Sequence, residues 1–398
     1  MIKIDQQKIE EVLTRGVEEI IDKESLKKKL LSGKVLRVKL GIDPTSPNIH
    51  IGRAIPLLKL RDFQNLGHKV VLIIGDFTGL IGDTSDKESE RPMLDEKTIK
   101  ENMKNYVKQA GKILDMRKCE VQYNSKWLKK IGWLQVAKMA NLFGVHEFTV
   151  RDVIAKRLEA GKRVSFLETM YPLMQGYDSV AVKADVELGG TDQRFNLLAG
   201  RDVQKHYGQA PQDIMTNPLI EGTDGRKMSS SWGNTINLFD SANEMFGKTM
   251  SLPDELVVKY FTLTTRVPLQ EIEEIEKMSN PRDQKAMLAK EIVKMYHGEK
   301  EAQKAEDEFN SMFRDKQIPT DITIFETDKT NYLILDLLFD SKLAESKNDA
   351  KRVVEGGGVT IEIQNSKLKI QNWREEIKIE DGMVIQFGKR KFIKVKLR

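Results

Sequence analysis

The sequence predicts an α/β fold built on a parallel sheet, followed by a helical region and a small α+β module. Three observations support this prediction. An apolar and basic run at residues 35–42 leads through a loop with two prolines into an amphipathic helix that begins near Arg53. Residues 70–74 form a wholly apolar run, which is typical of a strand buried in a parallel sheet. After Asn234 the alternation of strand and helix patterns stops, and successive amphipathic helices follow.

The composition is that of a globular protein with more than one domain. Hydrophobic residues make up 39% of the chain and charged residues 31%, which are ordinary values for such proteins. A length of 398 residues is too great for one typical core and indicates two or three domains. The net charge is only +5, and residues 331–398 hold 14 Lys and Arg against 10 Asp and Glu. Most of the positive excess therefore lies in the C-terminal part, which favours a local anionic partner.

Cysteine, histidine and apolar patterns disfavour several other classes of protein. Cys119 is the only cysteine, so an internal disulfide is excluded and a reducing cytoplasm is expected. The five histidines show no zinc-ligand spacing, and we expect no metal site. The N-terminal residues lack the apolar core of a signal peptide. No apolar run approaches the roughly 20 residues of a membrane-spanning helix, so no membrane partner is expected.

Several segments are predicted by pattern alone and carry no assigned chemistry. Residues 5–32 have apolar side chains at helical spacing and predict one or two charged helices. Helices are also predicted at residues 96–119 and 133–142, with a short strand and turn at 123–127 between them. Residues 317–330 are low in helical signal and are predicted to be a linker.

The loop at residues 43–52 has the layout of an anion-binding site. It lies between a predicted strand and a helix N-terminus, whose N–H groups and dipole favour phosphate. His50 can donate a hydrogen bond to a phosphate, and Gly52 lets a ligand approach the backbone. The alternative is a proline-rich connection in which the histidine has no function.

An acidic loop follows the second predicted strand. Its sequence is G-D-F-T-G-L-I-G-D-T-S. Because it directly follows the strand, it lies at the C-terminal edge of the sheet, where open α/β folds bind ligands. No G-K-[ST] follows, which excludes a P-loop. Asp83 is therefore a candidate ligand-binding residue, and the alternative is a solvated aspartate in a turn.

Three polar residues are predicted to share one face of a later helix. Tyr171, Gln175 and Asp178 are spaced four and three residues apart amid apolar neighbours. Burying a phenol, an amide and a carboxylate without partners would cost several kcal/mol, so they need a ligand or one another. Both possibilities remain open, a binding pocket and a satisfied core network.

The segment around Lys227 reads D-G-R-K-M-S-S-S, a glycine turn with cations and three hydroxyls that could bind a triphosphate. This segment and H-I-G-R at residues 50–53 resemble the two ATP-binding signatures of class I aminoacyl-tRNA synthetases. Y-P-L-M-Q-G-Y-D, from Tyr171, and E-L-G-G-T-D-Q-R-F-N, from Glu187, resemble the tyrosine pocket of bacterial tyrosyl-tRNA synthetases. The four motifs occur in the family's order, and the resemblance runs from about residue 33 to the C-terminus.

The resemblance implies a domain order and an activity. Residues 1–32 would be N-terminal helices, and residues 33–234 a catalytic domain with a doubly wound parallel sheet. Residues 235–325 would form a helical connecting domain, and residues 331–398 an RNA-binding domain. The reaction would join tyrosine to tRNA(Tyr) through tyrosyl-adenylate, with ATP as its Mg²⁺ complex and no permanent cofactor.

The resemblance also implies a role for individual residues. Tyrosine would be bound by Lys39, Gly41, Asp83, Tyr171, Gln175, Asp178 and Gln193. ATP would be bound by Asp43, Thr45, Gly52, Gly190, Asp192, Lys227 and Met228. The β and γ phosphates would be stabilised by His50, Arg53, Lys227, Ser229 and Ser230. Within the tyrosine pocket, Asp83 would hold the ammonium group with Tyr171 and Gln175, and Asp178 would accept the phenol hydroxyl. Lys87 and Arg91 would reach over the leaving pyrophosphate or form a solvated surface run.

Three positions depart from the family pattern. Arg53 stands where the first signature usually has histidine, and Ser230 where the second usually has lysine. Lys39 stands where some relatives place a tyrosine that binds the substrate's phenol. Arg53 and Ser230 leave a degenerate synthetase-like RNA-binding protein as an alternative. A tryptophanyl-tRNA synthetase, which shares the fold and an aspartate after the Y-P-x-x-Q run, is the other.

The C-terminal part resembles a small RNA-binding module found in several families. Two helices are predicted, the second capped by Ser346 with Asp349 three residues on, and strands follow. Four cations would lie along the helical face and contact tRNA phosphates, namely Lys342, Lys347, Lys351 and Arg352. Three more follow near the end of the chain at residues 389–391. A solvated basic face is the alternative.

A homodimer is also implied by the resemblance. Residues 143–166 alternate apolar side chains with cations and would form part of the subunit interface, with Phe166 as a candidate contact. In a monomer the same stripe would be ordinary core.

Overall fold

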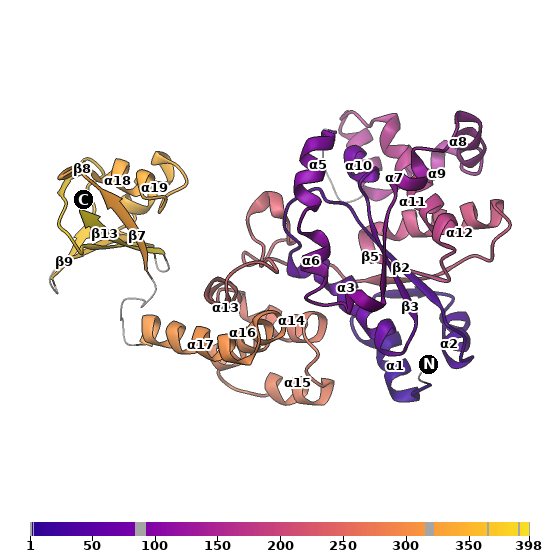
Figure 1. Ribbon diagram of the computed structural model, residues 1–398, viewed down its shortest axis with the longest axis horizontal. Helices are drawn as coiled ribbons and strands as arrows, with labels where there is room; N and C mark the ends of the chain where they lie inside the picture. The colour runs from indigo at the N-terminus through magenta and orange to yellow at the C-terminus, as the bar shows by residue number, and fades with distance from the viewer. Residues whose placement is uncertain are drawn as a thin grey trace. The chain divides into compact units, whose positions relative to one another are not determined.

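The computed structural model describes residues 2, 4–83, 93–314, 322–363, 366–388 and 391–397. The chain divides into two compact units, Met1–Gln303 and Lys304–Arg398 (Figure 1). Residues 235–303 belong to the first unit together with the large sheet. The domain boundaries predicted at residues 32/33, 234/235 and 325/331 remain predictions.

The first unit contains a six-stranded sheet in the order β1-β6-β5-β2-β3-β4. Its strands are β1 Glu19–Ile21, β2 Arg37–Ile42, β3 Lys69–Ile74, β4 Cys119–Tyr123, β5 Val186–Gly190 and β6 Asp213–Asn217. β2 to β6 pair in parallel, whereas β1 pairs antiparallel with β6, so the sheet is mixed at one edge. The chain leaves β2 toward β3 and β4 and leaves β5 toward β6, so the order reverses between β2 and β5. Open α/β sheets bind ligands at such a reversal.

Helices cover both faces of this sheet. α3, Ile51–Asn65, packs on β2, β3 and β5, and α11, Phe166–Val182, packs on β2 and on α12, Arg194–His206. Right-handed crossovers that run in opposite directions along a sheet place their helices on opposite faces. The predicted doubly wound α/β architecture is confirmed, with the antiparallel β1 as an addition.

The helices predicted at residues 5–32 are confirmed with an added strand, and the helical prediction for residues 96–119 is wrong in part. Residues 5–32 form α1, Gln6–Thr14, and α2, Lys23–Leu31, but β1 lies between them because its backbone pairs with the edge strand β6. Residues 96–119 are not one helix. They form α5, Glu96–Met103, and α6, Tyr106–Ala110, followed by turns and a 3-10 turn, Met116–Lys118, that leads into β4.

The remaining helices of this part are short. They are α4 Thr78–Ile81, α7 Ser125–Leu128, α8 Trp133–Ala140, α9 Val145–Thr149 and α10 Asp152–Glu159. α8 lies within the helix predicted at residues 133–142. Two 3-10 turns also border the sheet's ligand edge, Thr191–Gln193 and Ser230–Trp232.

Successive helices follow residue 240, as the sequence predicts. They are α13 Ala242–Met250, α14 Val257–Thr264, α15 Leu269–Glu276, α16 Pro281–His297 and α17 Glu299–Arg314, with a 3-10 turn at Asp254–Leu256. Prolines stand at the helix starts because a proline lacks the N–H that a helix interior needs. Pro268 caps α15 and Pro281 is the first residue of α16.

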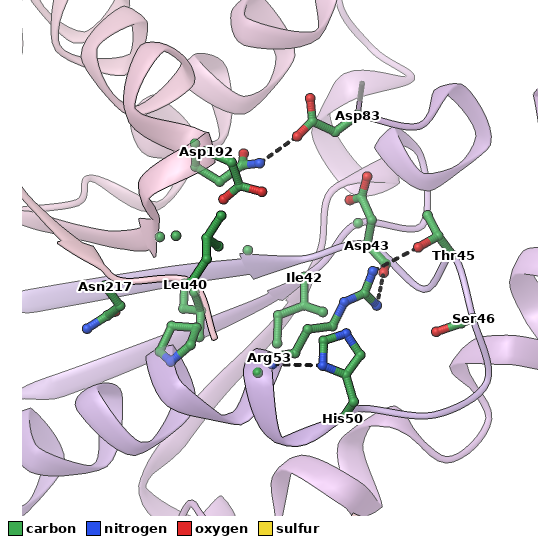
Figure 2. Close-up of a pocket in the computed structure, with 18 of the residues that line it drawn as sticks. Leu40, Ile42, Asp43, Thr45, Ser46, His50, Arg53, Asp83, Asp192 and Asn217 are labelled. Atoms are coloured by element: carbon green, nitrogen blue, oxygen red, sulfur yellow. Dashed lines mark hydrogen bonds between the residues drawn. The ribbon is translucent and has the colours of Figure 1, made fainter. Parts of the chain in front are cut away.

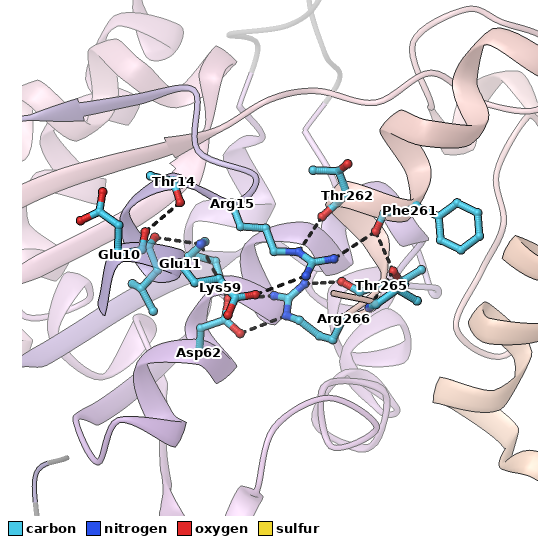
Figure 3. Close-up of polar contacts among 12 residues, drawn as sticks. Glu10, Glu11, Thr14, Arg15, Lys59, Asp62, Phe261, Thr262, Thr265 and Arg266 are labelled. Carbon is cyan, nitrogen blue, oxygen red and sulfur yellow. Dashed lines mark hydrogen bonds and ion pairs between the residues drawn. The ribbon is translucent and has the colours of Figure 1, made fainter. Parts of the chain in front are cut away.

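A buried polar cluster fastens α14 to α1 and α3 (Figure 3). The Arg15 guanidinium donates to the carbonyl oxygens of Thr262 at 3.1 Å and Phe261 at 3.3 Å, near the C-terminal end of α14. Arg266 donates two hydrogen bonds to the Asp62 carboxylate, at 3.0 and 2.9 Å. Burial lowers the pKa of the neighbouring Lys59 to about 8. α3, which begins at Ile51, is thus anchored near its C-terminal end.

The second unit is a small α+β module with its own core. Its five-stranded sheet has the order β10-β9-β12-β13-β7, and β11 pairs with β8. The strands are β7 Thr323–Thr327, β8 Asn331–Leu333, β9 Val359–Ile363, β10 Ser366–Ile370, β11 Glu376–Lys378, β12 Val384–Phe387 and β13 Lys391–Leu397. α18, Ile334–Asp340, and α19, Lys347–Glu355, pack together, and Ser346 caps α19 by accepting from the Asp349 N–H, as predicted.

The linker predicted at residues 317–330 is wrong at residues 323–327. This stretch forms β7, which pairs in parallel with β13. The sequence signal is weak because only its last residue is buried.

Among the described residues, no helix is both long and apolar enough to span a bilayer.

Candidate active site

A cavity of about 610 Å³ lies where the strand order reverses between β2 and β5. Its wall is built by the ends of these strands, the N-terminus of α3, one face of α11 and residues 227–231. Figure 2 shows part of this wall, with Leu40 and Ile42 on β2 and Arg53 in the first turn of α3. Among the described residues, every one predicted to bind tyrosine or ATP, or to stabilise the β and γ phosphates, lines this cavity except Lys39. These residues come from five separate stretches of the chain, and the fold gathers them at one place.

Asp43, directly after β2, is held by two hydroxyl donors. The Tyr171 phenol donates to one carboxylate oxygen at 2.8 Å and Thr78 Oγ1 to the other at 2.7 Å. Desolvation raises the pKa of Asp43 to about 6 despite these donors. Gly75 makes room for this carboxylate, since a Cβ there would lie 1.9 Å from Asp43 Oδ1. Thr78 and Gly75 were not predicted as site residues.

Asp178 is the most buried carboxylate of the cavity, with 4% of its surface exposed. Trp127 Nε1 donates to its Oδ1 at 2.7 Å, and Asn124 Nδ2 donates to its Oδ2 at 3.2 Å. Burial raises the pKa of Asp178 to about 7, and the Lys39 charge is the first influence that opposes this rise. Each carboxylate oxygen has a second lone pair, so Asp178 can still accept a hydroxyl from a ligand.

Asp83 and Gln175 offer acceptors suited to a cation. Gln193 Nε2 donates to the Asp83 carboxylate at 2.5 Å, which orients it at the cavity wall. Gln175 Nε2 donates to Glu187 Oε1 at 3.1 Å, so its amide oxygen is the atom that can accept from a ligand. With the Tyr171 oxygen, these groups could hold an ammonium ion.

Lys39 is not brought to the cavity. Its side chain is 1% exposed, and Nζ lies 2.9 Å from Glu187 Oε1 in a buried ion pair. Nζ also donates to the Gln175 carbonyl oxygen at 3.0 Å and to Ser179 Oγ at 2.6 Å. The ammonium group therefore lies between β2 and α11 and not at the cavity. The prediction that Lys39 contacts the substrate's phenol is corrected accordingly.

The first ATP signature forms the N-terminus of α3. His50 is the N-cap residue, and its Nδ1 accepts from the Arg53 N–H at 3.3 Å (Figure 2). Gly52 fits tightly, because a Cβ there would lie 3.1 Å from His50 Nδ1. The Arg53 guanidinium lies against the preceding loop, donating to Thr45 Oγ1 at 3.0 Å. A charged guanidinium and a helix N-terminus both favour an anion here.

The second signature lies beside the first on the cavity wall. Lys227 Nζ stands 3.6 Å from Asp192 Oδ2, and the Gly52 N–H points at Met228 Sδ at 3.4 Å, so the two signatures touch. Asn234 ties the loop together by accepting from the Ser229 N–H at 2.9 Å and donating to the Lys227 carbonyl oxygen at 3.1 Å. Ser229 and Ser231 share a hydrogen bond of 2.9 Å.

Comparison with known proteins decides the family. A model of the tRNA synthetases class I (W and Y) matches residues 31–314, which is well over half of the chain. The chain belongs to this family of class I synthetases. Among relatives of similar length, the tyrosine–tRNA ligase of Thermotoga maritima is 45% identical over 390 residues, covering 96% of each chain. That of Shewanella oneidensis is 45% identical over 391 residues, covering 97% of each.

Solved structures support the class I synthetase fold. A C-terminally truncated mitochondrial tyrosyl-tRNA synthetase of Coccidioides posadasii has a TM-score of 0.63 and 24% identity, covering 76% of this chain and 92% of that one. A tyrosyl-tRNA synthetase of Archaeoglobus fulgidus complexed with L-tyrosine has a TM-score of 0.61 and 22% identity, covering 75% and 99%. At these identities the likeness concerns the fold.

Some residues of the site could not be found from sequence patterns. Asn124 and Trp127 follow β4, and only the strand order brings them to Asp178.

Lys87 and Arg91, predicted to reach over pyrophosphate, lie outside the described residues. Within the described ranges, no group of three or more His, Cys, Asp or Glu side chains is arranged to hold a metal ion.

The predicted tRNA-binding cations lie in the second unit, three of them on α19. Each of these three has a carboxylate partner: Lys347 with Asp336 at 2.6 Å, Lys351 with Glu355 at 3.9 Å and Arg352 with Asp349 at 2.7 Å. Lys351 also lies over the Trp373 ring at 4.4 Å from its centroid. Lys342 follows α18 in the left-handed conformation, with φ +60°. The residue pair at 389 and 390 lies outside the described residues.

Proposed function

We propose that this chain is a tyrosine–tRNA ligase that makes tyrosyl-adenylate and then tyrosyl-tRNA(Tyr). The match over nearly the whole length to tyrosine–tRNA ligases carries this conclusion. The cavity supports this proposal. Its carboxylates can bind the ammonium group and hydroxyl of an amino acid, and its cations can bind the phosphates of a nucleoside triphosphate.

The first step activates tyrosine. A carboxylate oxygen of tyrosine attacks the α-phosphorus of ATP, a P–O bond forms, and the bond to the β-phosphate breaks to release pyrophosphate. His50, Arg53 and Lys227 stabilise the charge that moves onto the β and γ phosphates, and the hydroxyls at residues 229–231 donate hydrogen bonds. No protein nucleophile is needed, since positioning and charge stabilisation lower the barrier.

Tyrosine binds at the carboxylates. Asp83, Tyr171 and Gln175 hold its ammonium group, and Asp178 accepts its phenol hydroxyl. Asp192 binds the ribose of ATP after separating from Lys227. In the second step, a hydroxyl of the terminal adenosine of tRNA attacks the tyrosyl carbonyl carbon, and AMP leaves with the electron pair of the broken bond.

Mg²⁺ enters as part of the nucleotide substrate. Phosphate oxygens are the hard ligands that this ion prefers, and it commonly keeps water in its remaining positions. We assign it no dedicated set of protein ligands and propose no permanent cofactor.

Tyrosine-dependent ATP–pyrophosphate exchange is the test of this function. The wild-type chain should exchange with tyrosine and far less with tryptophan or phenylalanine. Exchange with tryptophan alone would point to the other branch of the family. Absence of exchange with all three amino acids would favour a degenerate RNA-binding protein. This alternative is tested because Arg53 and Ser230 depart from the family's two signatures.

The second unit is proposed to bind tRNA through Lys342, Lys347, Lys351 and Arg352. A truncated protein that ends at Arg314 should retain exchange and lose most tRNA charging, because only the tRNA step would use the tail. Charging by the full chain should weaken as salt rises, since phosphate contacts release counterions. Undiminished charging by the truncated protein would contradict this role.

We also propose a cytoplasmic homodimer. Large apolar side chains at residues 133–166 are exposed in the single chain, including Trp133 at 84%, Val145 at 75% and Phe166 at 76%. Exposed apolar side chains of this size favour a protein interface. Light scattering of the wild type and of Phe166→Asp tests this, and a monomeric wild type at micromolar concentration would contradict it.

Tyrosine, ATP and tRNA meet in the cytoplasm, and its reducing conditions suit the lone Cys119.

A further inference from the structure

Three side chains from α5 and α6 bind the backbone of the loop before α3. Asn102 Nδ2 donates to the Pro44 carbonyl oxygen at 2.9 Å, and Gln109 Nε2 donates to that of Pro47 at 2.9 Å. Between them, the Tyr106 hydroxyl donates to the Ser46 carbonyl oxygen at 2.7 Å. All three side chains bind the same loop, so they lie on one side of the helical pair. We call Asn102, Tyr106 and Gln109 the loop-binding face.

Tyr106 differs from its two neighbours because it also contacts a predicted catalytic side chain. Its hydroxyl accepts from Arg53 Nη1 at 3.0 Å. A phenol has one hydrogen, so donation to the Ser46 carbonyl directs a lone pair at the guanidinium. The Tyr106 ring is fully buried and does not line the cavity. Any effect on the reaction must therefore pass through Arg53 or the loop.

The Arg53 guanidinium is oriented by three acceptors. Besides Tyr106, Nη1 donates to the Asp43 carbonyl oxygen at 3.4 Å, and Nη2 donates to Thr45 Oγ1 at 3.0 Å (Figure 2). These contacts use three of the five N–H donors of a planar group, and Arg53 lines the cavity. Because the plane is set by these contacts, the remaining donors have a defined direction when a phosphate arrives.

We propose that Tyr106 is a positioning residue that holds Arg53 and the Thr45 loop in the geometry needed for pyrophosphate departure. This inference rests on the proposed function. A long arginine side chain has more rotamers than the histidine usual at this signature position, so it requires an external support. The loop-binding face supplies that support from residues to which the sequence patterns assign no chemistry.

Tyr106→Phe tests the inference in the full chain, since it removes one hydroxyl and keeps the ring. The rate of tyrosyl-adenylate formation should fall about 10-fold or more, the scale of a hydrogen bond to a charged group. The KM for tyrosine should not change. Tyr296→Phe is the matched control, because that buried hydroxyl has no hydrogen-bond partner within the described residues. It should leave the rate unchanged.

A double-mutant cycle separates positioning from a general loss of structure. Tyr106→Phe should cost little further rate in an Arg53→Ala background, because the group that it positions is already gone. Equal losses in both backgrounds, or full activity of Tyr106→Phe, would overturn the inference while wild-type exchange would still support the proposed function. A wild type without tyrosine-dependent exchange would overturn both.

Discussion

Two sets of ionisable residues share the cavity and are supported in different ways. The acidic set, Asp83 and Asp178, is held by side-chain donors from neighbouring elements, and its deeper member is 4% exposed. The basic set, His50, Arg53 and Lys227, stands at a helix N-terminus and on a loop, where the Lys227 side chain is 32% exposed.

The difference follows from what each set would bind. The ammonium group and the side chain of the amino acid keep their charge and shape through activation, so the ligands of these groups can be built into the core. The phosphates separate during the reaction, so their ligands must follow a moving charge. The acidic set should therefore govern which substrate binds, and the basic set should govern how fast it reacts. Four predictions test this division, from the largest expected effect to the smallest.

Lys39→Met should destabilise the buried core beside the acidic set. It leaves Glu187 buried without its cation, and breaking one side of a buried ion pair costs about 3–5 kcal/mol of the free energy of unfolding. Denaturant titration measures the loss. The double variant Lys39→Met/Glu187→Gln should recover most of it, and a loss unchanged in the double variant would show that the ion pair is not the cause.

Lys227→Ala should reduce the rate of tyrosine activation by about 10²-fold or more, the scale for losing one transition-state donor. Tyrosine affinity should barely change, because the lysine belongs to the basic set. Pre-steady-state adenylate formation gives both values. A large rise in the dissociation constant of tyrosine would break the proposed division between the two sets.

Asp178→Ala should sharply lower the ratio of kcat/KM for tyrosine over phenylalanine, by roughly 10-fold or more. Phenylalanine leaves a buried acceptor unpaired in the wild type, and that penalty disappears with the carboxylate. Asp178→Asn should weaken tyrosine activation. Lys39→Ala, assayed beside them, should lower activity with both amino acids and preserve more of the ratio. The reverse pattern would assign discrimination to Lys39.

The smallest effect should be a pH dependence of tyrosine binding. Because the pKa of Asp178 is raised to about 7, the side chain is mostly protonated near pH 6 and mostly ionised near pH 8. The ionised form accepts the phenol hydroxyl, so the KM for tyrosine should fall a few-fold between pH 6 and pH 8. Asp178→Asn should flatten this part of the profile, leaving any titration of Asp43 near pH 6. An unchanged profile would place the titration elsewhere.

Local patterns in the sequence determined much of this site. The spacing of Tyr171, Gln175 and Asp178 predicts a shared helical face, and α11 presents all three to the cavity. The stretch from residue 35 to Arg53 predicts a strand, a loop and a helix N-terminus, which the structure contains. These features follow from backbone periodicity and capping, which depend on residues close together in the chain.

Other features were decided only by tertiary structure. Trp127 reaches Asp178 across 51 positions of the chain, and Tyr106 reaches Arg53 across 53. β1 exists because the β6 edge offers its backbone a partner, although the sequence of β1 also fits a helix. Lys39 carries a charge that suggests a ligand, yet the pairing of β2 with β5 places Glu187 beside it and satisfies that charge inside the core. Which partner a polar side chain finds depends on strand order and register, and these are properties of the assembled sheet.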